Sequence, residues 1–332
     1  MEFRTLGRTG VNVTKLCLGT MNFGPRTSEA DSIELIHRAL EAGINFVDTA
    51  NFYGQPLNDG RGQGTTEKIV GKGLGSKRDH VVLATKFFAT MDQDDPNSRG
   101  GSRRNIIQAC EASLRRLQTD YIDLYQMHRP DSTVPIDETL RALDDLIQSG
   151  KVRYIGTSTF AGWQLMESLW TSDRLHLNRF VSEQPRYSLI DRRIENEVVP
   201  MAQKYGIAIL PYSPLGGGIL TGKYNRDTPF PDGSRAVDGA WGSWATSFLS
   251  DKVYGLVDII REQAAELGCT VSQLALAWVL SQPGVTSAII GPRTLVHLED
   301  NLGAIDVTLD EETLQRLNEA SEPGGVLFDP SP

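Results

Sequence analysis

Four polar residues, Asp48, Tyr53, Lys86 and His128, lie at or just after the ends of apolar runs that are typical of buried strands. The runs cover residues 44–48, 81–86 and 121–128. Parallel strands buried under helices place catalytic side chains at their carboxyl ends. A carboxylate, a tyrosine, a lysine and a histidine at such ends therefore predict one shared site.

The predicted site can donate a proton to a carbonyl oxygen. A free tyrosine has a pKa of about 10 and is too weak an acid near neutral pH to deliver a proton efficiently. The ammonium of Lys86 would favour the phenolate of Tyr53, because an opposite charge in contact moves a pKa by roughly one to three units. Asp48 would keep Lys86 charged, and His128 would orient an oxygen on which negative charge develops. Since none of these residues is a reductant, a hydride-carrying cofactor is required.

Composition and charge argue against several classes of partner. The chain has 332 residues, an apolar fraction of 39% and a formal net charge of −9, so neither a nucleic acid nor a membrane is an expected partner. Its first residues do not resemble a signal peptide, and no apolar stretch is long enough to span a bilayer. The cysteines, Cys17, Cys110 and Cys269, are far apart within apolar runs, which predicts reduced side chains in a cytoplasmic protein.

Short β-branched runs alternate with helical patterns, which indicates parallel strands joined by crossover helices. The strands are predicted to begin near Leu16, Asn45, Val81, Tyr121, Val152, Phe180, Ile207 and Thr286. Eight such units without a linker favour a closed (β/α)8 TIM barrel over an open sheet, and we expect residues 1–332 to form a single domain. The turn at residues 7–10 lies between polar-alternating arms and predicts an N-terminal β-hairpin that caps the bottom of the barrel.

The helices between these strands carry recognisable start and stop signals. Ser28 precedes an apolar stripe at helical spacing. Pro135 opens another helix, which Gly150 ends. Thr270 and Gln273 have the spacing of a capping box ahead of a third helix.

Long loops are expected at the C-terminal face of the barrel. Residues 54–65, 90–101 and 216–251 form connections that are longer than turns require, and all three follow strands. The third is rich in glycine, proline and aromatic residues and suits a lid, in which Trp241 and Trp244 are expected to pack the loop. The residues expected to border the substrate pocket are Phe23, Phe87, Phe88 and Tyr187.

Other patterns in the chain do not support other kinds of site. Residues 217–223 satisfy most of a phosphate-loop pattern, but Tyr224 stands where a serine or threonine must hold the metal. Residues 71–75 end a helix instead of following a strand, so they indicate a helix stop rather than a dinucleotide fingerprint. The five histidines show no paired spacing, so no metal site is expected.

Six motifs, in this order and at these separations, carry a likeness to one family. They are LCLGTM (16–21), FVDTANFYG (46–54), ATK (84–86), YIDLYQMH (121–128), GKVRYIG (150–156) and YSPL (212–215). The sequence resembles the aldo-keto reductases over essentially the whole chain, with motifs like those of the bacterial, channel-β-subunit-like and sugar-reductase-like branches. The resemblance implies a (β/α)8 barrel that binds NADPH in extended form without a Rossmann domain. It also implies Tyr53 as general acid/base, Lys86 and Asp48 as its tuning pair, and His128 as the group that orients the carbonyl.

The resemblance implies cofactor contacts position by position. The residues that match contacts with the nicotinamide, through its carboxamide or its ring face, are Ser158, Gln184 and Tyr212. Those that match the pyrophosphate-covering loop and its basic clamp are Ser213, Leu215, Gly217, Lys223 and Arg235. Those that match the stretch holding adenosine and its 2′-phosphate are Gly291, Arg293, His297, Asp300 and Asn301. Further cofactor contacts are expected from Gly19, Thr20, Met21, Asp48, Thr159 and Pro214.

Three positions depart from the family pattern. Thr159 stands where many members have an asparagine beside the carboxamide, which would shorten or remove one hydrogen bond. His297 and Asp300 replace the more usual glutamine and glutamate near the 2′-phosphate. Arg293, at the start of a predicted helix, would still serve a phosphate well by its fork geometry and the helix dipole.

Three functions remain to be weighed. The first is an NADPH-dependent carbonyl reductase that acts on a small aldehyde, ketone or sugar-like substrate, as a monomer or a homo-oligomer. The second is an NADPH-binding, redox-sensing regulatory subunit with slow turnover, because residues 216–224 and Arg235 resemble the channel-subunit branch. The third is a barrel lyase with Lys86 as a Schiff-base amine, which ranks last because Asp48 would hold that amine protonated.

Overall fold

Eight parallel strands form the centre of the structure. The computed structural model describes residues 1–54, 63–237, 242 and 246–322. The strands are β3 (Leu16–Gly19), β4 (Phe46–Asp48), β5 (Val82–Phe87), β6 (Ile122–Met127), β7 (Val152–Ser158), β8 (Phe180–Gln184), β9 (Ala208–Ile209) and β10 (Ala288–Ile290). They pair in the order β10-β3-β4-β5-β6-β7-β8-β9. Backbone hydrogen bonds from Thr286 to Ile209 and from Ile289 to Pro211, both 2.8 Å, join the two ends, so the predicted TIM-barrel fold is confirmed.

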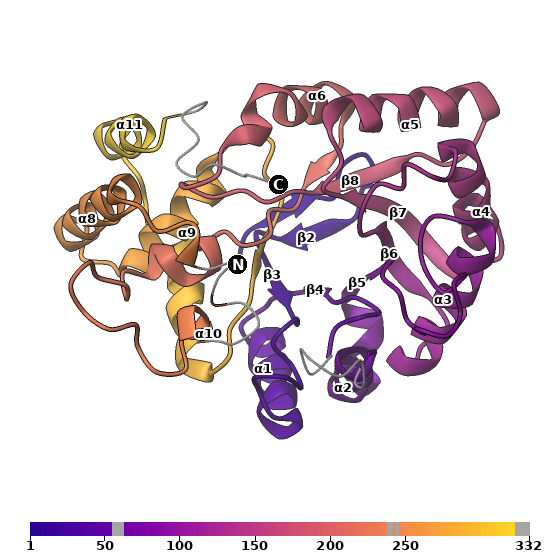
Figure 1. The fold of residues 1–332 in the computed structure, drawn as a ribbon, viewed down its shortest axis with the longest axis horizontal. Helices are drawn as coiled ribbons and strands as arrows, with labels where there is room; N and C mark the ends of the chain where they lie inside the picture. Colours follow the sequence, from indigo (N-terminus) through magenta and orange to yellow (C-terminus); the bar gives the residue numbers. More distant parts are fainter. Residues whose placement is uncertain (55–62, 238–241, 243–245, 323–332) are drawn as a thin grey trace.

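Helices cover the outside of the strands (Figure 1). They are α1 (Glu29–Glu41), α2 (Thr65–Leu74), α3 (Arg103–Leu117), α4 (Ile136–Gln148), α5 (Gly162–Leu175), α6 (Val198–Tyr205), α8 (Asp251–Glu266), α9 (Val271–Ser281), α10 (Leu295–Leu302) and α11 (Glu311–Ala320). Ser28 caps α1 through its side chain, and Thr270 and Gln273 form the predicted capping box of α9. Helix α4 begins after Pro135, and Gly150 takes a positive φ of 74° just beyond its end. These start and stop signals are therefore confirmed.

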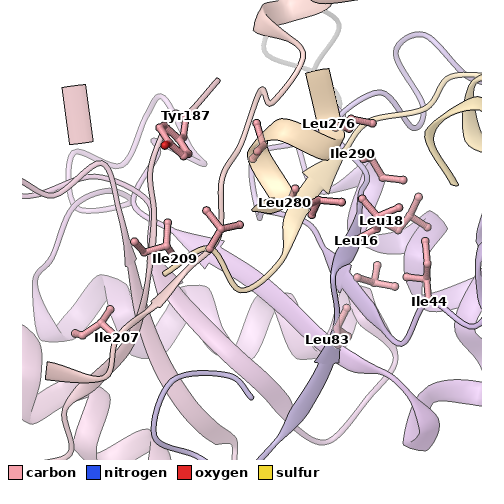
Figure 2. Packing of buried hydrophobic residues seen from close by; sticks show 14 of the residues in the cluster. Leu16, Leu18, Ile44, Leu83, Tyr187, Ile207, Ile209, Leu276, Leu280 and Ile290 are labelled. Atoms are coloured by element: carbon pink, nitrogen blue, oxygen red, sulfur yellow. The ribbon is translucent and has the colours of Figure 1, made fainter. Parts of the chain in front are cut away.

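Alternation along the strands divides the apolar core in two. Leu16 and Leu18 of β3 pack toward the helices, as Figure 2 shows, whereas Cys17 between them belongs to the cluster inside the barrel. The interior cluster also contains Ala84 of β5. Because successive side chains of a strand point to opposite faces, Lys86 lies on the same inner face one step nearer the carboxyl end. The apolar interior thus ends in a polar layer at the top of the barrel.

The N-terminal hairpin closes the other end. Strands β1 (Phe3–Thr5) and β2 (Asn12–Thr14) pair antiparallel, and the fully buried side chains of Leu6 and Val13 join the interior cluster. The turn approaches the amino ends of β8 and β9, where a Cβ on Gly7 would lie 2.5 Å from the carbonyl oxygen of Val181. The hairpin that the sequence predicts is confirmed as the cap of the barrel bottom.

The long connections lie at the carboxyl ends of the strands. Gln63 donates a 2.8 Å hydrogen bond to the carbonyl of Thr90, which joins the first long connection to the second. The third begins with a 3-10 turn at Gly216–Thr221. Trp241 and Trp244 lie outside the described residues. Over the part of the chain that the structure describes, no single helix is long and apolar enough to cross a membrane, and α8 and α9, which pass that test only together, are bent by 96°.

Two glycines of the hairpin turn allow a matched stability test. Gly7 and Gly10 both have positive φ, 55° and 76°, but only Gly7 approaches other atoms, including the carbonyl oxygens of Val181 and Gly206. Gly10→Ala adds backbone strain alone, which costs about 1 kcal/mol. Gly7→Ala adds the same strain and a backbone clash, so we expect its free energy of unfolding to fall by about 1–3 kcal/mol more. Urea unfolding of both variants measures the difference, and equal losses would contradict the packing of the hairpin against β8 and β9.

Candidate active site

The four residues singled out by chemistry converge at the top of the barrel. Asp48 is the last residue of β4, Lys86 lies in β5, and His128 follows β6 by one position. Tyr53 lies in the turn after β4, which is held by backbone hydrogen bonds from Tyr53 to Ala50 and from Gly64 to Tyr53. The rings of Tyr53 and His128 meet edge to face with their centroids 6.0 Å apart. The strand ends therefore bring residues 80 positions apart in the chain, from Asp48 to His128, into one site.

A buried ion pair lies beneath the tyrosine. The Nζ of Lys86 donates to Asp48 Oδ1 at 2.5 Å, to the carbonyl of Thr49 at 2.9 Å and to the hydroxyl of Tyr53 at 3.4 Å. The side chain of Lys86 is fully buried and that of Asp48 is 4% exposed. All three protons of the ammonium thus have acceptors, which a charge removed from water requires.

Burial and charge act in opposite directions on Lys86 and Tyr53. Burial disfavours the ammonium of Lys86, but Asp48 and then Tyr53 outweigh it, so the pKa of Lys86 is raised. Burial also raises the pKa of Tyr53, and Lys86 opposes this effect without cancelling it. The predicted acidifying field is present, but the net pKa shift of Tyr53 is upward. Tyr53 is therefore a protonated phenol at neutral pH.

His128 is a neutral imidazole. Burial, followed by the positive charges of Lys86 and Arg129, holds its pKa well below the usual value. Its Nδ1 is buried and has no hydrogen-bond partner in the described part of the protein. A neutral ring retains one N–H donor, which can reach an oxygen in the site without adding a second positive charge beside Lys86.

Two glutamines complete the surroundings of the carboxylate. Gln126 of β6 and Gln184 at the end of β8 each donate from Nε2 to Asp48 Oδ2 at 3.0 Å. Gln184 also donates to Oε1 of Gln126 at 3.2 Å. Gln126 is not among the site residues that the sequence predicts. Its available signal is an amide at an inward strand position that otherwise carries apolar side chains such as Leu124.

A cavity of about 510 Å³ opens above this layer. Tyr53 and His128 line it, and Lys86 lies beneath its wall. All residues predicted to contact a cofactor also line it, namely Gly19, Thr20, Met21, Asp48, Ser158, Thr159, Gln184, Tyr212, Ser213, Pro214, Leu215, Gly217, Lys223, Arg235, Gly291, Arg293, His297, Asp300 and Asn301. Further lining residues, which the sequence does not predict, include Asn22, Arg26, Phe52, Arg129, Arg186 and Ser272. They lie on loops or helix starts whose shape the sequence does not specify.

The predicted aromatic wall is wrong. Phe23, Phe87 and Tyr187 are almost completely buried in the helix-facing core, and Phe88 packs against that core. Phe87 follows the inward-facing Lys86, so alternation turns its ring outward to lie 4.8 Å from that of Tyr125. Phe52, whose ring centroid lies 5.1 Å from that of Tyr53, lines the cavity instead.

The loop after β9 supplies a glycine cradle and a cation. Gly216, Gly217 and Gly218 all have positive φ, between 56° and 101°, a conformation that glycine adopts without strain, and Gly217 and Gly218 line the cavity. Lys223 lies against this turn, because a Cβ on Gly218 would be 3.0 Å from its Nζ. Burial and the charges of Arg293 and Arg235 lower the pKa of Lys223. Three cations from two distant segments therefore gather at one end of the cavity, an arrangement that suits phosphate groups.

Several residues that are predicted to contact a cofactor already form hydrogen bonds within the protein. Arg293 donates to the carbonyl of Gly233 at 2.8 Å, which ties the start of α10 to the long loop. Asp300 accepts from the hydroxyl of Thr270, the N-cap of α9, at 2.7 Å. The hydroxyl of Thr159 donates to the carbonyl of the preceding residue at 2.7 Å, so this side chain is turned toward its own backbone.

Comparisons with known proteins place the chain in one family. The family model described as "Aldo/keto reductase family" matches residues 15–322. The uncharacterized oxidoreductase YrpG of Bacillus subtilis is 41% identical over 98% of both chains. A probable voltage-gated potassium channel subunit beta of Arabidopsis thaliana is 35% identical over 92% of both, and the versiconal hemiacetal acetate reductase of Aspergillus parasiticus is 32% identical over 98% of both.

The chain belongs to the aldo/keto reductase family. It is accordingly an NAD(P)-dependent oxidoreductase that acts on small carbonyl compounds.

A buried acid, Glu183, lies behind the turn after β7 that lines this aldo/keto reductase cavity at Ser158 and Thr159. Glu183 of β8 accepts from the hydroxyl of Thr157 at 2.5 Å and from the backbone N–H of Phe160 at 3.1 Å. The turn that it holds contains Thr159 at a strained φ of 61°. Burial raises the pKa of Glu183 to about 8, against the hydrogen bonds that it accepts.

The raised pKa of Glu183 predicts a pH dependence of stability. The ordinary pKa of this group is 4.5, so between that pH and about 8 the folded protein keeps a proton that the unfolded chain has released. Stability from this group is therefore complete below pH 4.5 and is lost as the pH rises toward 8. We expect Glu183→Gln to flatten this fall, as measured by urea unfolding across the pH range. Glu34→Gln, at an exposed site on α1, is the control, and equal pH profiles for the two variants would contradict the assignment.

Proposed function

We propose that this protein is an NADPH-dependent carbonyl reductase in which Tyr53 is the general acid, with the reverse oxidation using the same groups. The observation that carries the proposal is the hydroxyl of Tyr53, which lies at the cavity wall 3.4 Å from the Nζ of Lys86. Lys86 is in turn paired with Asp48 at 2.5 Å. Reduction of a carbonyl adds a hydride at carbon and a proton at oxygen, and Tyr53 supplies the proton.

The surroundings of Tyr53 suit this role because they stabilise the phenolate once it has formed. Burial keeps the phenol protonated before the reaction, so the proton is present when a carbonyl oxygen approaches. When it leaves, the fixed charge of Lys86 lies beside the new phenolate and requires no rearrangement. His128, a neutral donor beside the same ring, orients the carbonyl oxygen. These groups act in a cavity wall from which water is largely removed, where such interactions are stronger.

The residues of the cavity fit NADPH. Its volume of about 510 Å³ lies within the range of small-molecule sites. Ser158 and Gln184 line the cavity near Asp48, whereas Lys223, beside the glycine turn, Arg235 and Arg293 provide positive charge for phosphates. When bound, NADPH supplies the hydride.

A lyase with a Schiff-base lysine fits the geometry poorly. Such a nucleophile requires a neutral amine. Asp48 and Tyr53 raise the pKa of Lys86 instead, and all of its donors point to acceptors. Lys86 therefore holds its proton.

A second candidate is an NADPH-binding regulatory subunit with slow turnover. It is favoured by the 35% identity to a protein named as a probable potassium channel subunit beta and by the bond from Arg293 to Gly233 across the long loop. The purified protein separates the two functions. A reductase oxidises NADPH when a panel of aldehydes and ketones is added, whereas a regulatory subunit binds the cofactor and stays inert.

Removal of the phenolic hydroxyl tests the catalytic role. Tyr53→Phe should lower turnover by roughly 10² to 10⁴, because the general acid is lost, while the affinity for NADP⁺ is retained. Steady-state rates with an aldehyde and a fluorescence titration with NADP⁺ give the two quantities. Tyr254→Phe, on α8 and stacked with Arg226, controls for loss of a hydroxyl elsewhere. Undiminished turnover in Tyr53→Phe would refute the proposed role.

Arg293 tests the preference for the 2′-phosphate. Arg293→Gln removes a charge-assisted contact, which should weaken NADP⁺ binding by about 10- to 100-fold and leave NAD⁺ binding nearly unchanged. The ratio of the two dissociation constants excludes any general effect of losing the bond to Gly233. Arg316→Gln on α11, which removes a surface ion pair with Glu262, is the control. An equal loss for both cofactors would show that Arg293 only supports the loop.

A further inference from the structure

Asp48, Gln126 and Gln184 form a closed triangle of hydrogen bonds at the top of the barrel. Both glutamines donate to Asp48 Oδ2 at 3.0 Å, and Gln184 donates to Gln126 Oε1 at 3.2 Å. At most 3% of the surface of each residue is exposed. Asp48 Oδ1 is occupied separately by Lys86. The triangle thus links the ion pair under Tyr53 to a residue that lines the cavity.

The acceptors offered by Asp48 and Gln126 determine how the two amide groups are oriented. An ionised carboxylate only accepts hydrogen bonds, so each glutamine must turn its NH₂ group to Asp48. The second N–H of Gln184 is then directed to the oxygen of Gln126. With both of its N–H groups engaged inside the barrel, Gln184 retains only its carbonyl oxygen for a ligand. A ligand group at this place must therefore be a donor.

The strand between the two glutamines leaves room for their contact. Gln126 on β6 pairs with Gly156 on β7, which pairs with Ser182 on β8. A Cβ on Gly156 would lie 2.3 Å from the hydroxyl oxygen of Ser182 and 3.3 Å from the Cγ of Gln126. Because Gly156 has no side chain, the side chain of Gln126 can reach past β7 to Gln184.

We propose that Gln126 is a positioning residue that locks the amide of Gln184 so that its oxygen faces the cofactor and selects a carboxamide NH₂. This inference rests on the proposed function, since it concerns how the same cavity recognises the nicotinamide. Gln126 acts through two neighbours. It donates to Asp48, which also accepts from Lys86, and its Oε1 accepts the N–H of Gln184 that could otherwise rotate toward the cavity. Carboxamide recognition and the Lys86–Asp48 pair are consequently one hydrogen-bonded unit.

The inference is tested by binding alone, without relying on catalysis: residue 126 and the carboxamide of the cofactor are changed separately and together, and each dissociation constant is measured. The probes are NADP⁺ and its 3-acetylpyridine analogue, which replaces the carboxamide NH₂ with a methyl group. Wild-type protein should bind NADP⁺ about tenfold more tightly, the factor that one hydrogen bond contributes. In Gln126→Met, which has similar volume and no amide, one of the two hydrogen bonds that hold the amide of Gln184 is lost, so its oxygen is held less firmly. The preference should fall to about twofold or less, as measured by fluorescence titration of the full-length chain.

Two further variants separate positioning from folding. In Gln126→Glu the carboxyl group lies beside Asp48 and keeps its proton, so it can donate to Asp48 and still accept the N–H of Gln184, and the variant should retain the preference for NADP⁺. Tyr125→Phe removes a buried hydrogen bond to Ile106 from the outward face of the same strand and should leave the preference unchanged. Thermal unfolding shows whether each variant is folded.

Each outcome supports or overturns the inference. Loss of the preference in Gln126→Met, with retention in Gln126→Glu and Tyr125→Phe, supports it. Equal weakening for both probes in Gln126→Met, or an unchanged preference, overturns the inference and leaves the proposed function intact. Wild-type protein that binds neither probe overturns both. Activity of Tyr53→Phe reports on the reductase alone, so the two failures are distinguishable.

Discussion

The buried contact between Lys86 and Asp48 is the constraint on which the rest of the site depends. A charge removed from water is tolerated only where its donors and acceptors are all satisfied. Lys86 meets this condition with Asp48, Thr49 and Tyr53, and Asp48 meets it with Lys86 and two glutamines. Loss of one partner would leave an uncompensated charge inside the barrel. The same requirement therefore places the tyrosine, the lysine and the amides in fixed positions before any ligand arrives.

The barrel can supply this arrangement because its interior is apolar near the hairpin and polar near the carboxyl ends of the strands. The hairpin and the lower strand positions fill it with apolar side chains such as Leu6, Val13 and Phe46. Two positions further along a strand the same inward face becomes polar, as Ala84 gives way to Lys86 and Leu124 to Gln126. Rigid strands thus carry the charges, and the loops above them carry the groups that contact a ligand. Because the strands hold their backbones fixed, the donor–acceptor distances among Asp48, Gln126 and Gln184 stay near 3 Å.

The sequence predicts the strands, the hairpin and the four central residues well, because each leaves a local pattern. Apolar runs that end in Asp48 or His128 mark strand ends, and helix caps such as Ser28 and Thr270 mark the helix starts. The predicted aromatic wall is wrong at Phe87 because the alternation of a strand, inward at Lys86 and outward at Phe87, must be applied residue by residue. Phe23, Phe88 and Tyr187 lie in connections between elements, whose course the sequence does not specify. The net pKa shift of Tyr53 is missed for a different reason. It depends on burial, which residue types alone do not specify.

The positive end of the cavity shows what distinguishes the two candidate functions. Lys223 and Arg235 come from the long loop, whereas Arg293 belongs to the segment before α10, and burial together with the charges of Arg293 and Arg235 lowers the pKa of Lys223. In a chain with a net charge of −9, this local cluster of positive charge suits an anion such as a phosphate. Bound phosphate would accordingly draw the loop and α10 together across the existing bond from Arg293 to Gly233. Stronger closure slows release without altering Tyr53, Lys86 or Asp48. A reductase and a regulatory subunit would therefore share the groups at Tyr53, Lys86 and Asp48, and the difference that we propose between them is how long this loop would retain the cofactor.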